Sequence, residues 1–313
     1  MNITELTDKV NNIVQQYVPA PEGPSEIVAE AMAYAMSSGG KRIRPLIMYL
    51  VYKSLAGEAK SDAAAASSVD AASADEEVLR RFMSAIEMIH TSSLIHDDLP
   101  ALDNDSLRRG MPTVHVKYRE DAAILAGDAL MNLAYETAVS ALDENPGSAA
   151  IGSALSVLIK KTGMQGMLGG QSADVMLSGK AITEEERDFI YEKKTSALIE
   201  APFMIGAILA GAEASDVEKL ETAGRDLGLA FQVRDDILDI ISDAETLGKE
   251  VGQDEKNNKS TYAAVYGVEA AENYVNAKTA SVLGILDSVI TTPDREEAVL
   301  LKELVEKLAG RNS

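Results

Sequence analysis

The sequence predicts an all-α fold. Ala, Leu, Met, Glu and Lys dominate long segments, in which apolar residues recur with the 3.6-residue period of a helix. We find no convincing pair of segments with the alternation that is typical of strands. Residues 44–56 and 198–210 are apolar on nearly all sides, which favours burial within a large bundle of antiparallel neighbours.

Helical periodicity marks segments in chain order at residues 25–37, 44–56, 78–98, 121–142, 147–168, 184–211, 216–242 and 269–289. Residues 57–76 are a low-complexity run of Ala, Ser and Asp, which indicates a mobile surface loop or a weakly populated helix. Residues 243–261 are charged and lack core periodicity, so we expect a loop whose spaced lysines can serve function. No repeat of fixed period and no dividing linker is visible, which predicts a single domain over residues 1–313.

The composition excludes several classes of function. The 313 residues contain 29 Lys and Arg against 50 Asp and Glu, so the net charge is −21. This charge argues against a nucleic-acid partner and against docking on anionic lipid. The absence of Cys excludes disulfides, iron–sulfur clusters and thiol catalysis, and three His leave little room for a zinc site.

The amino terminus and the apolar stretches predict a soluble, cytoplasmic protein. The first ten residues, MNITELTDKV, lack the basic and apolar regions of a signal peptide. The longest mostly apolar stretch, from Ala201 to Ala212, contains Pro202 and is too short to span a bilayer. We therefore expect no stable membrane insertion.

Two clusters of aspartates stand out, each on a helix that is otherwise apolar. The first, in LIHDDLPALDND, comprises Asp97, Asp98, Asp103 and Asp105. Pro100 predicts that the helix ends around Leu99, so that Asp103 reaches back from the following turn. The second, in FQVRDDILDII, comprises Asp235, Asp236 and Asp239. Asp235 and Asp239 share a helical face with Gln232.

Aspartates that lie side by side repel one another. At 4 Å and an effective dielectric near 20, each pair costs about 4 kcal/mol. Such clusters bind protons, lie in open water or hold cations. Oxygen ligands without His or Cys favour a hard ion, Mg²⁺ or Mn²⁺.

Compact groups of cations accompany the aspartates. They are GGKRIRP at 39–45, Arg108-Arg109-Gly110, Lys194-Thr195, Lys249 and Lys259. Each alone is typical of a solvated surface charge. Glycines let the backbone approach phosphate, and helix N-termini attract anions. Together these groups supply what a metal-bound diphosphate and a second, metal-free diphosphate require.

In this order the motifs resemble those of the trans-prenyl diphosphate synthases, the farnesyl and geranylgeranyl diphosphate synthases of the isoprenoid synthase class. The matching motifs are GKxxR at 40–44, DDLPALD with the following RRG, GQ at 170–171, KT at 194–195, FQVRDDILD, and GKEVGQD…KST, and they extend from about residue 39 to 262. The resemblance implies a single-domain helical bundle with a central active-site cavity, and a homodimer.

Position by position, the resemblance implies a role for each site residue. The Mg²⁺ ligands would be Asp97, Asp103 and Asp235, with Asp98, Asp236 and Asp239 as outer or partial ligands. The allylic diphosphate would be held by Arg108, Lys194 and Lys249, and the isopentenyl diphosphate by Lys41, Arg44, His90 and Arg109. Thr195 and Gln232 would line the reacting carbons.

The implied activity is a head-to-tail condensation of isopentenyl diphosphate with dimethylallyl, geranyl or farnesyl diphosphate. Metal and cations stabilise the charge that builds on the departing diphosphate, and apolar helices keep water from the allylic cation. No side chain is an obvious general base. In the family the departing diphosphate is thought to take the proton.

Product length depends on residues before the first aspartate cluster. At 1.5 Å per residue, Ser93 and Ser92 lie about 6 and 7.5 Å below Asp97 along the helix, and Ile89 and Ile86 continue the stripe. Many bacterial farnesyl synthases of this type have an aromatic residue where Ser92 stands. The small side chains here predict geranylgeranyl diphosphate, with farnesyl diphosphate as the shorter alternative.

Three other functions share features with the sequence but fit it less well. A terpene cyclase shares the ionisation chemistry but needs an aromatic pocket, and this chain is 4% aromatic without Trp. A non-catalytic regulatory subunit of a heteromeric prenyl synthase would be expected to have lost one aspartate cluster. A calcium-binding scaffold would lack the ordered basic motifs and has no EF-hand spacing here.

Overall fold

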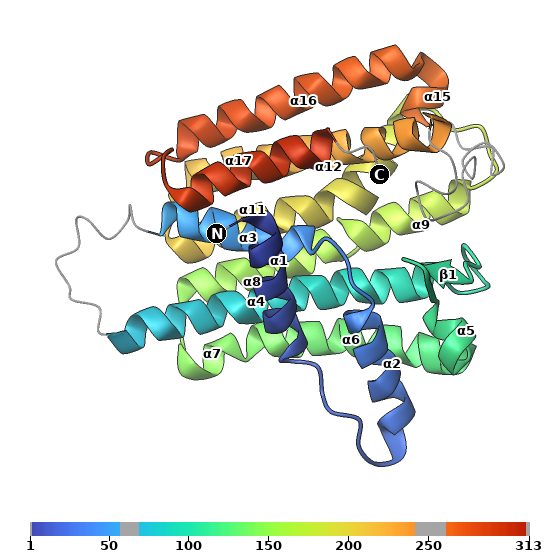
Figure 1. The fold of residues 1–313 in the computed structure, drawn as a ribbon, viewed down its shortest axis with the longest axis horizontal. Helices are drawn as coiled ribbons and strands as arrows, with labels where there is room; N and C mark the ends of the chain where they lie inside the picture. Colours follow the sequence, from blue (N-terminus) through green and yellow to red (C-terminus); the bar gives the residue numbers. More distant parts are fainter. Residues whose placement is uncertain (1, 57–68, 242–260, 311–313) are drawn as a thin grey trace. The chain divides into compact units, whose positions relative to one another are not determined.

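The structure, a computed structural model, describes the backbone of residues 2–56, 69–241 and 261–310, with side chains except at 69–74 (Figure 1). The first half of the described chain forms α1 (Ile3–Gln15), the 3₁₀ turn η1 (Gly23–Ser25), α2 (Glu26–Ser37), α3 (Ile43–Leu55), α4 (Val69–Asp97), α5 (Val114–Tyr118), α6 (Glu120–Val139), α7 (Ala141–Glu144) and α8 (Ala149–Thr162). The second half forms α9 (Met167–Leu177), α10 (Glu184–Ile190), the π-helical segment η2 (Tyr191–Ser196), α11 (Ala197–Ala210), α12 (Ala214–Ile241), α15 (Tyr262–Tyr266), α16 (Val268–Val289) and α17 (Glu296–Ala309). The all-α prediction is confirmed.

The structure differs from the predicted elements at identifiable places. Helices α1 and α17 were not predicted, although Asn2 and Glu5 form a capping box that starts α1. The predicted helix 147–168 is divided, because the chain turns at Gly163 between α8 and α9. A short antiparallel hairpin, β1 (Leu107–Arg108) and β2 (Met111–Pro112), is present where no strand was expected.

The two segments predicted as loops lie partly outside the described residues. Residues 69–76, at the end of the low-complexity run, belong to α4, and residues 57–68 lie outside the described part. Most of the charged segment 243–261, with Lys249 and Lys259, also lies outside it. Thr261, its last residue, caps α15 through a hydrogen bond from the Ala264 backbone N–H.

Contacts between Cα atoms divide the chain into two compact units. The first unit comprises Met1–Tyr49 and Ala65–Leu155, and the second comprises Leu50–Ala64 and Ser156–Ser313. A single domain over residues 1–313 stays a prediction.

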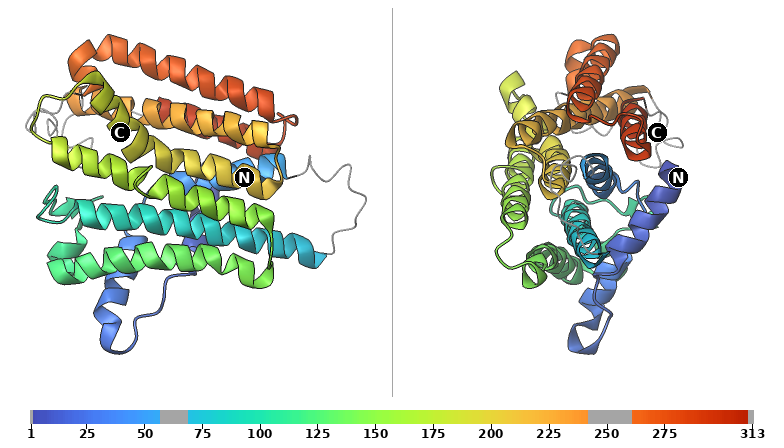
Figure 2. Two further views of the ribbon diagram at one scale, coloured as in Figure 1. Left: turned by 180° about the vertical axis from the view of Figure 1, so that it is seen from behind. Right: turned by 90° about the vertical axis from the view of Figure 1, so that its left-hand side faces the viewer.

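In the first unit, α4 packs along α6, and the two helices lie side by side in every view (Figures 1 and 2). The buried face of α4 repeats at helical spacing through Leu79, Phe82, Met83 and Ile86, and that of α6 through Ala123, Ala126, Leu130 and Ala134. The small side chains of α6 let the larger ones of α4 fill the space between the helices. This packing fixes the helix that carries the first aspartate cluster.

In the second unit, α12 packs against α11 on one side and α16 on another (Figure 2). Two glycines of α12 permit the close approach. A Cβ atom on Gly224 would lie 2.6 Å from Glu200 Cα, and one on Gly228 would lie 2.5 Å from Ser196 Cα. Any larger residue there would force the helices apart, so these glycines set where α12, with the second aspartate cluster, meets η2 and α11.

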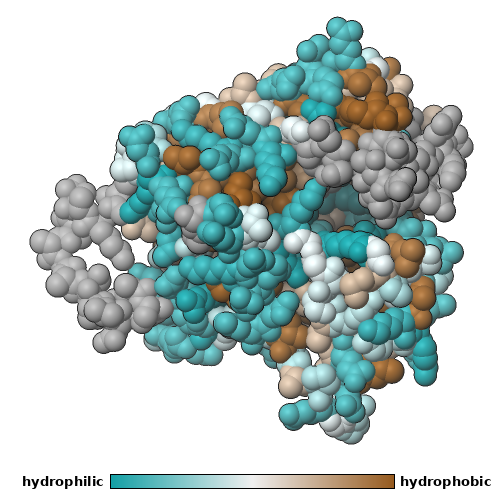
Figure 3. Space-filling view, viewed as in Figure 1, coloured by the Kyte–Doolittle hydropathy of each residue, from teal (hydrophilic) through white to brown (hydrophobic). Residues whose placement is uncertain are grey.

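The surface agrees with the acidic composition. Hydrophilic residues cover most of the face drawn in Figure 3, with smaller hydrophobic areas between them. Within the described residues, no helix is long and apolar enough to cross a membrane.

Candidate functional site

The first aspartate cluster lies at the carboxyl end of α4, where the chain turns. The helix ends at Asp97, two residues before the predicted end, and Pro100 lies in the turn that follows. The Asp103 backbone N–H donates to the Asp97 carbonyl oxygen at 2.9 Å, and Asn104 adopts a φ of +54°. The turn thus brings Asp103 back beside Asp97, as the sequence predicts.

Asp98, which follows Asp97 in the chain, is buried and forms an ion pair with Arg108. The Arg108 Nε atom donates to Asp98 Oδ1 at 2.7 Å, and Arg108 Nη2 lies 3.4 Å from Asp105 Oδ2. Burial raises the pKa of the Asp98 carboxyl above its ordinary value, and the Arg108 guanidinium opposes that rise. In this structure Arg108 ties the hairpin to α4, and its role toward an allylic diphosphate stays a prediction.

Three of the residues predicted for isopentenyl diphosphate, two arginines and a histidine, form one electrostatic group in the first unit. We call Arg44, His90 and Arg109 the cation cluster. Burial and the nearby charge of Arg109, opposed by the charge of Glu87, lower the pKa of Arg44 to about 10. Burial also holds the pKa of His90 well below its ordinary value, and the charges of Arg44 and Arg109 add to this effect. Such mutual repulsion between cations favours a bound anion.

The glycines of GGKRIRP position Arg109. Gly40 adopts a φ of +132°, and a Cβ atom there would lie 2.5 Å from Arg109 Nη1. The same Nη1 atom donates a hydrogen bond to the Gly39 carbonyl oxygen. Lys41, the fourth predicted ligand, is exposed at the surface of this turn.

A buried ion pair that sequence reasoning missed lies behind the cation cluster. Arg42 Nη1 donates to Glu87 Oε1 at 2.7 Å, and both side chains are about 2% exposed. Arg42 Nε also donates to Asn11 Oδ1 at 2.6 Å. Glu87 Oε2 and Arg44 Nε are buried without a hydrogen-bond partner. Nothing in the sequence indicates that Arg42 is buried, because it stands between Lys41 and Arg44 in a run of charged residues that is typical of a surface.

The neutral state of His90 predicts a pH dependence of stability. The unfolded chain takes up a proton near the ordinary pKa of 6.5, whereas folded His90 stays neutral to a much lower pH. The free energy of unfolding should therefore fall as the pH drops below 6.5, by up to about 1.4 kcal/mol per pH unit from this group.

Thermal unfolding of the His90→Gln variant between pH 7 and pH 5 tests this prediction. The loss of stability toward pH 5 should be smaller in His90→Gln than in the wild type. His115→Gln is the matched control and should follow the wild type. Equal slopes for the wild type and His90→Gln would contradict the prediction.

The residues predicted to govern product length lie in the last third of α4. Ser92 is fully buried and donates to the Ile89 carbonyl oxygen at 2.8 Å, and Ile89 is also fully buried. Ser93 is half-buried and donates to the His90 carbonyl oxygen at 2.9 Å. Both hydroxyls are thus satisfied within their own helix, and both positions present small side chains.

In the second unit, Lys194 and Thr195 lie on the π-helical segment η2, where the sequence predicted a regular helix. Such segments are frequent at functional sites. Two close contacts hold η2 in place. A Cβ atom on Gly170 of α9 would lie 2.1 Å from the Lys194 backbone nitrogen, and Gly228 of α12 meets Ser196 as described above. Lys194 Nζ lies 2.5 Å from Asp174 Oδ2 of α9.

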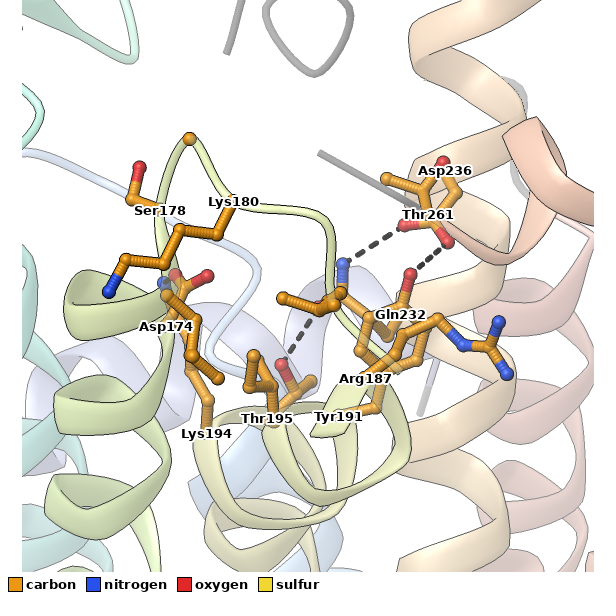
Figure 4. A pocket seen from close by; sticks show the side chains of 14 residues that line it. Asp174, Ser178, Lys180, Arg187, Tyr191, Lys194, Thr195, Gln232, Asp236 and Thr261 are labelled. Atoms are coloured by element: carbon orange, nitrogen blue, oxygen red, sulfur yellow. Dashed lines mark hydrogen bonds and ion pairs between the residues drawn. The ribbon is translucent and has the colours of Figure 1, made fainter. Parts of the chain in front are cut away.

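Hydrogen bonds connect η2 to the second aspartate cluster on α12 (Figure 4). The Thr195 hydroxyl donates to Gln232 Oε1 at 2.8 Å, and Gln232 Nε2 donates to Asp236 Oδ1 at 3.2 Å. Asp236 is buried, whereas Asp235 and Asp239 are half-buried on the adjoining face. The predicted neighbours Thr195 and Gln232 are therefore brought into direct contact.

A pocket of about 650 Å³, including its open part, lies in this unit (Figure 4). Its polar lining is formed by Asp174, Ser178, Lys180, Arg187, Tyr191, Lys194, Thr195, Gln232, Asp236 and Thr261. It thus contains Lys194, Thr195 and Gln232, all three predicted from the sequence. Arg108, also predicted for the allylic substrate, does not line this pocket, and Lys249 lies outside the described residues. Sequence reasoning missed Asp174, Tyr191 and Arg187.

Over residues 2–56, 69–241 and 261–310, no group of three or more acidic or His side chains could by itself hold a metal ion. Each unit nevertheless offers carboxylate oxygens at the predicted positions, Asp97 and Asp103 in the first and Asp235 and Asp239 in the second. Mg²⁺ is usually bound by one or two carboxylates together with substrate phosphates and water. The oxygen-only donors fit such an ion.

The sequence matches a known family model and characterised relatives. Residues 25–298 match the model of the polyprenyl synthetase family. The chain is 40% identical over 270 residues to a farnesyl diphosphate synthase of Geobacillus stearothermophilus, covering 86% of this chain and 85% of that protein. It is also 40% identical over 273 residues to a chloroplastic geranylgeranyl pyrophosphate synthase of Capsicum annuum, covering 87% of this chain and 69% of that protein.

Solved structures of related enzymes are also similar to this chain over nearly its whole length. A FPP/GFPP synthase of Zymomonas mobilis superposes with a TM-score of 0.80 at 30% identity, covering 98% of this chain and 97% of that one. A geranyltransferase of Helicobacter pylori, complexed with magnesium and isoprenyl diphosphate, superposes with a TM-score of 0.79 at 30% identity, covering 98% and 94%.

Proposed function

The chain belongs to the polyprenyl synthetase family, and from this premise we propose that it is a short-chain trans-prenyltransferase. It joins isopentenyl diphosphate head-to-tail to dimethylallyl, geranyl or farnesyl diphosphate and releases diphosphate. The observation that carries the proposal is the pocket that brings together Lys194, Thr195 and Gln232, three of the four described residues predicted for the allylic substrate.

We propose that the enzyme uses Mg²⁺. The donors are the carboxylate oxygens of Asp97, Asp103, Asp235 and Asp239, with Asp98 as a partial ligand. When bound to the substrate diphosphate, Mg²⁺ would stabilise the negative charge of the leaving group. A hard oxygen ligand set of this kind also accepts Mn²⁺.

The residues of the second unit act on the allylic substrate. Lys194 supplies positive charge to the leaving diphosphate, where charge develops as the carbon–oxygen bond breaks. Thr195 and Gln232 lie beside it and line the reacting carbons. Arg108 and Lys249 are proposed to bind the same diphosphate.

The cation cluster and Lys41 bind isopentenyl diphosphate. Arg44 and Arg109 offer forked donors suited to phosphate oxygens. Neutral His90 donates or accepts a hydrogen bond without adding to the repulsion between the arginines. The apolar α4 helix shields the allylic cation from water, which would otherwise capture it.

The proposed product is geranylgeranyl diphosphate. The support for this product is the small size of Ser92 and Ser93, which precede Asp97 on α4 where an aromatic ring would limit the length of the growing chain. Ser92→Phe should therefore shift the main product from twenty to fifteen carbons, whereas Ser92→Ala should keep twenty. Chromatography of the prenyl alcohols measures the shift, and melting curves show whether both variants fold. An unchanged product in folded Ser92→Phe would contradict the role of this position.

An endpoint assay tests the proposed function. The purified protein is incubated with Mg²⁺, excess isopentenyl diphosphate and, separately, dimethylallyl, geranyl or farnesyl diphosphate, and the products are dephosphorylated and identified. Twenty-carbon geranylgeraniol is expected. A stop at fifteen carbons keeps the enzyme class and rejects the proposed product. Cyclic hydrocarbons, or no elongation by folded protein, would support a terpene cyclase or a regulatory subunit instead.

We also propose a homodimer. Helix α6 exposes Ile124, Leu125 and Val139, which lie within one helical face. A second copy would remove this apolar area from water. Light scattering after gel filtration should give about twice the 33.3 kDa of one chain, and a mass of one chain would reject the dimer.

A further inference from the structure

Tyr191 joins three segments of the second unit at the edge of the pocket (Figure 4). Its hydroxyl donates to Asp236 Oδ2 of α12 at 2.5 Å. The Tyr262 backbone N–H, at the start of α15, donates to both Tyr191 Oη and Asp236 Oδ2 at 3.1 Å. Tyr191 itself begins η2, the segment that carries Thr195.

The Tyr191 ring and hydroxyl lie in different surroundings. The ring belongs to a buried apolar cluster with Val233, Ile237 and Ala263. The hydroxyl lies at the border of the pocket, where a tyrosine can satisfy a polar group without losing its packing. Burial and the Asp236 carboxylate raise the Tyr191 pKa far above its ordinary value, so the hydroxyl remains a proton donor throughout the working pH range.

A series of hydrogen bonds connects Asp236 to Gln232 and Thr195, two residues proposed to line the allylic substrate. With Asp236 Oδ2 taken by Tyr191 and Tyr262, Oδ1 accepts from Gln232 Nε2. This fixes the orientation of the Gln232 amide, whose Oε1 then accepts from the Thr195 hydroxyl. If the Asp236 carboxylate moved out of reach, the Gln232 amide would lose the acceptor that holds its NH₂ group, and it could flip to present that group to Thr195 instead.

We propose that Tyr191 is a positioning residue for the allylic substrate, acting through Asp236 and Gln232 on Thr195. The inference rests on the proposed function and extends it to a residue that no motif in the sequence indicated. Tyr191 touches no reacting atom. It holds the Asp236 carboxylate against Gln232, which keeps the Gln232 amide in one orientation, so that Thr195 and Gln232 present their polar atoms correctly to the allylic substrate.

Steady-state kinetics of Tyr191→Phe test this inference. The change keeps the ring in its apolar cluster and removes only the hydroxyl. We expect kcat/KM for geranyl diphosphate to fall about tenfold or more, because a hydrogen bond to a charged group is lost, while KM for isopentenyl diphosphate changes less than twofold. Tyr274→Phe is the matched control. Tyr274 stacks on Tyr262 with ring centroids 4.7 Å apart, and its change should alter each constant less than twofold.

A double-mutant cycle separates positioning from a general structural role. If Tyr191 acts through Gln232 and Thr195, Tyr191→Phe should have less than a twofold effect in a Thr195→Val background. Independent, multiplicative losses would overturn the inference, as would equal losses for both substrates. No elongation by the wild type overturns the proposed function and this inference with it. An active wild type with Tyr191→Phe indistinguishable from Tyr274→Phe overturns this inference alone.

Discussion

Replacing Asp97 with Ala is expected to lower kcat for prenyl transfer about 1,000-fold or more. Metal binding to a leaving group supplies several kcal/mol of charge stabilisation, and about 4 kcal/mol corresponds to that factor. Asp97 is the last residue of α4, and Asp103 returns beside it through a backbone hydrogen bond. The variant therefore loses a proposed metal ligand without opening the α4–α6 core.

Initial rates over a titration of Mg²⁺ measure this effect. Asp128→Ala is the matched control, because Asp128 is exposed on α6 in the same unit and has no proposed metal role. Its rate should stay within twofold of the wild type. An Asp97→Ala enzyme that keeps a tenth of wild-type kcat would remove Asp97 from the proposed metal site.

Gly170→Ala is expected to destabilise the protein by about 1–3 kcal/mol and to reduce activity strongly. Its Cβ atom would lie 2.1 Å from the Lys194 backbone nitrogen, a contact that no rotamer can relieve. The backbone of η2 or α9 must then move, and the Lys194 side chain moves with it. A shift of about 1 Å in a positioned group is enough to lower a rate a hundredfold.

Chemical denaturation and initial rates check both parts of this prediction. Gly284→Ala in α16 is the control, because nothing lies within 4 Å of its added Cβ atom. That change should be neutral or stabilise by up to about 1 kcal/mol. If Gly170→Ala behaved like Gly284→Ala, the close packing of α9 on η2 would not matter for the site.

Local sequence signals predicted much of this fold. Pro100 indicated where the helix of the first cluster ends, and the structure confirms the turn that returns Asp103 to Asp97. Gln232 and Asp235 were correctly assigned to one helix. α1 carried a capping box and apolar residues at helical spacing, so its signal was present and was overlooked.

The remaining features depend on contacts between distant residues. Gly170 and Gly228 let two other helices approach the π-helical segment closely. Neither contact can be predicted from the local periodicity of the sequence. The Arg42–Glu87 pair joins residues 45 positions apart, and Tyr191 meets Asp236 over the same separation. A sequence pattern shows that such groups exist, but only the fold shows which of them pair.

The central claim is that this chain transfers a prenyl group to isopentenyl diphosphate with help from Mg²⁺. Incorporation of labelled isopentenyl diphosphate into solvent-extractable product, with geranyl diphosphate as acceptor, tests it most directly. We expect incorporation that requires both the acceptor and Mg²⁺ and that disappears with EDTA. Folded protein that incorporates no label at any Mg²⁺ concentration would contradict it.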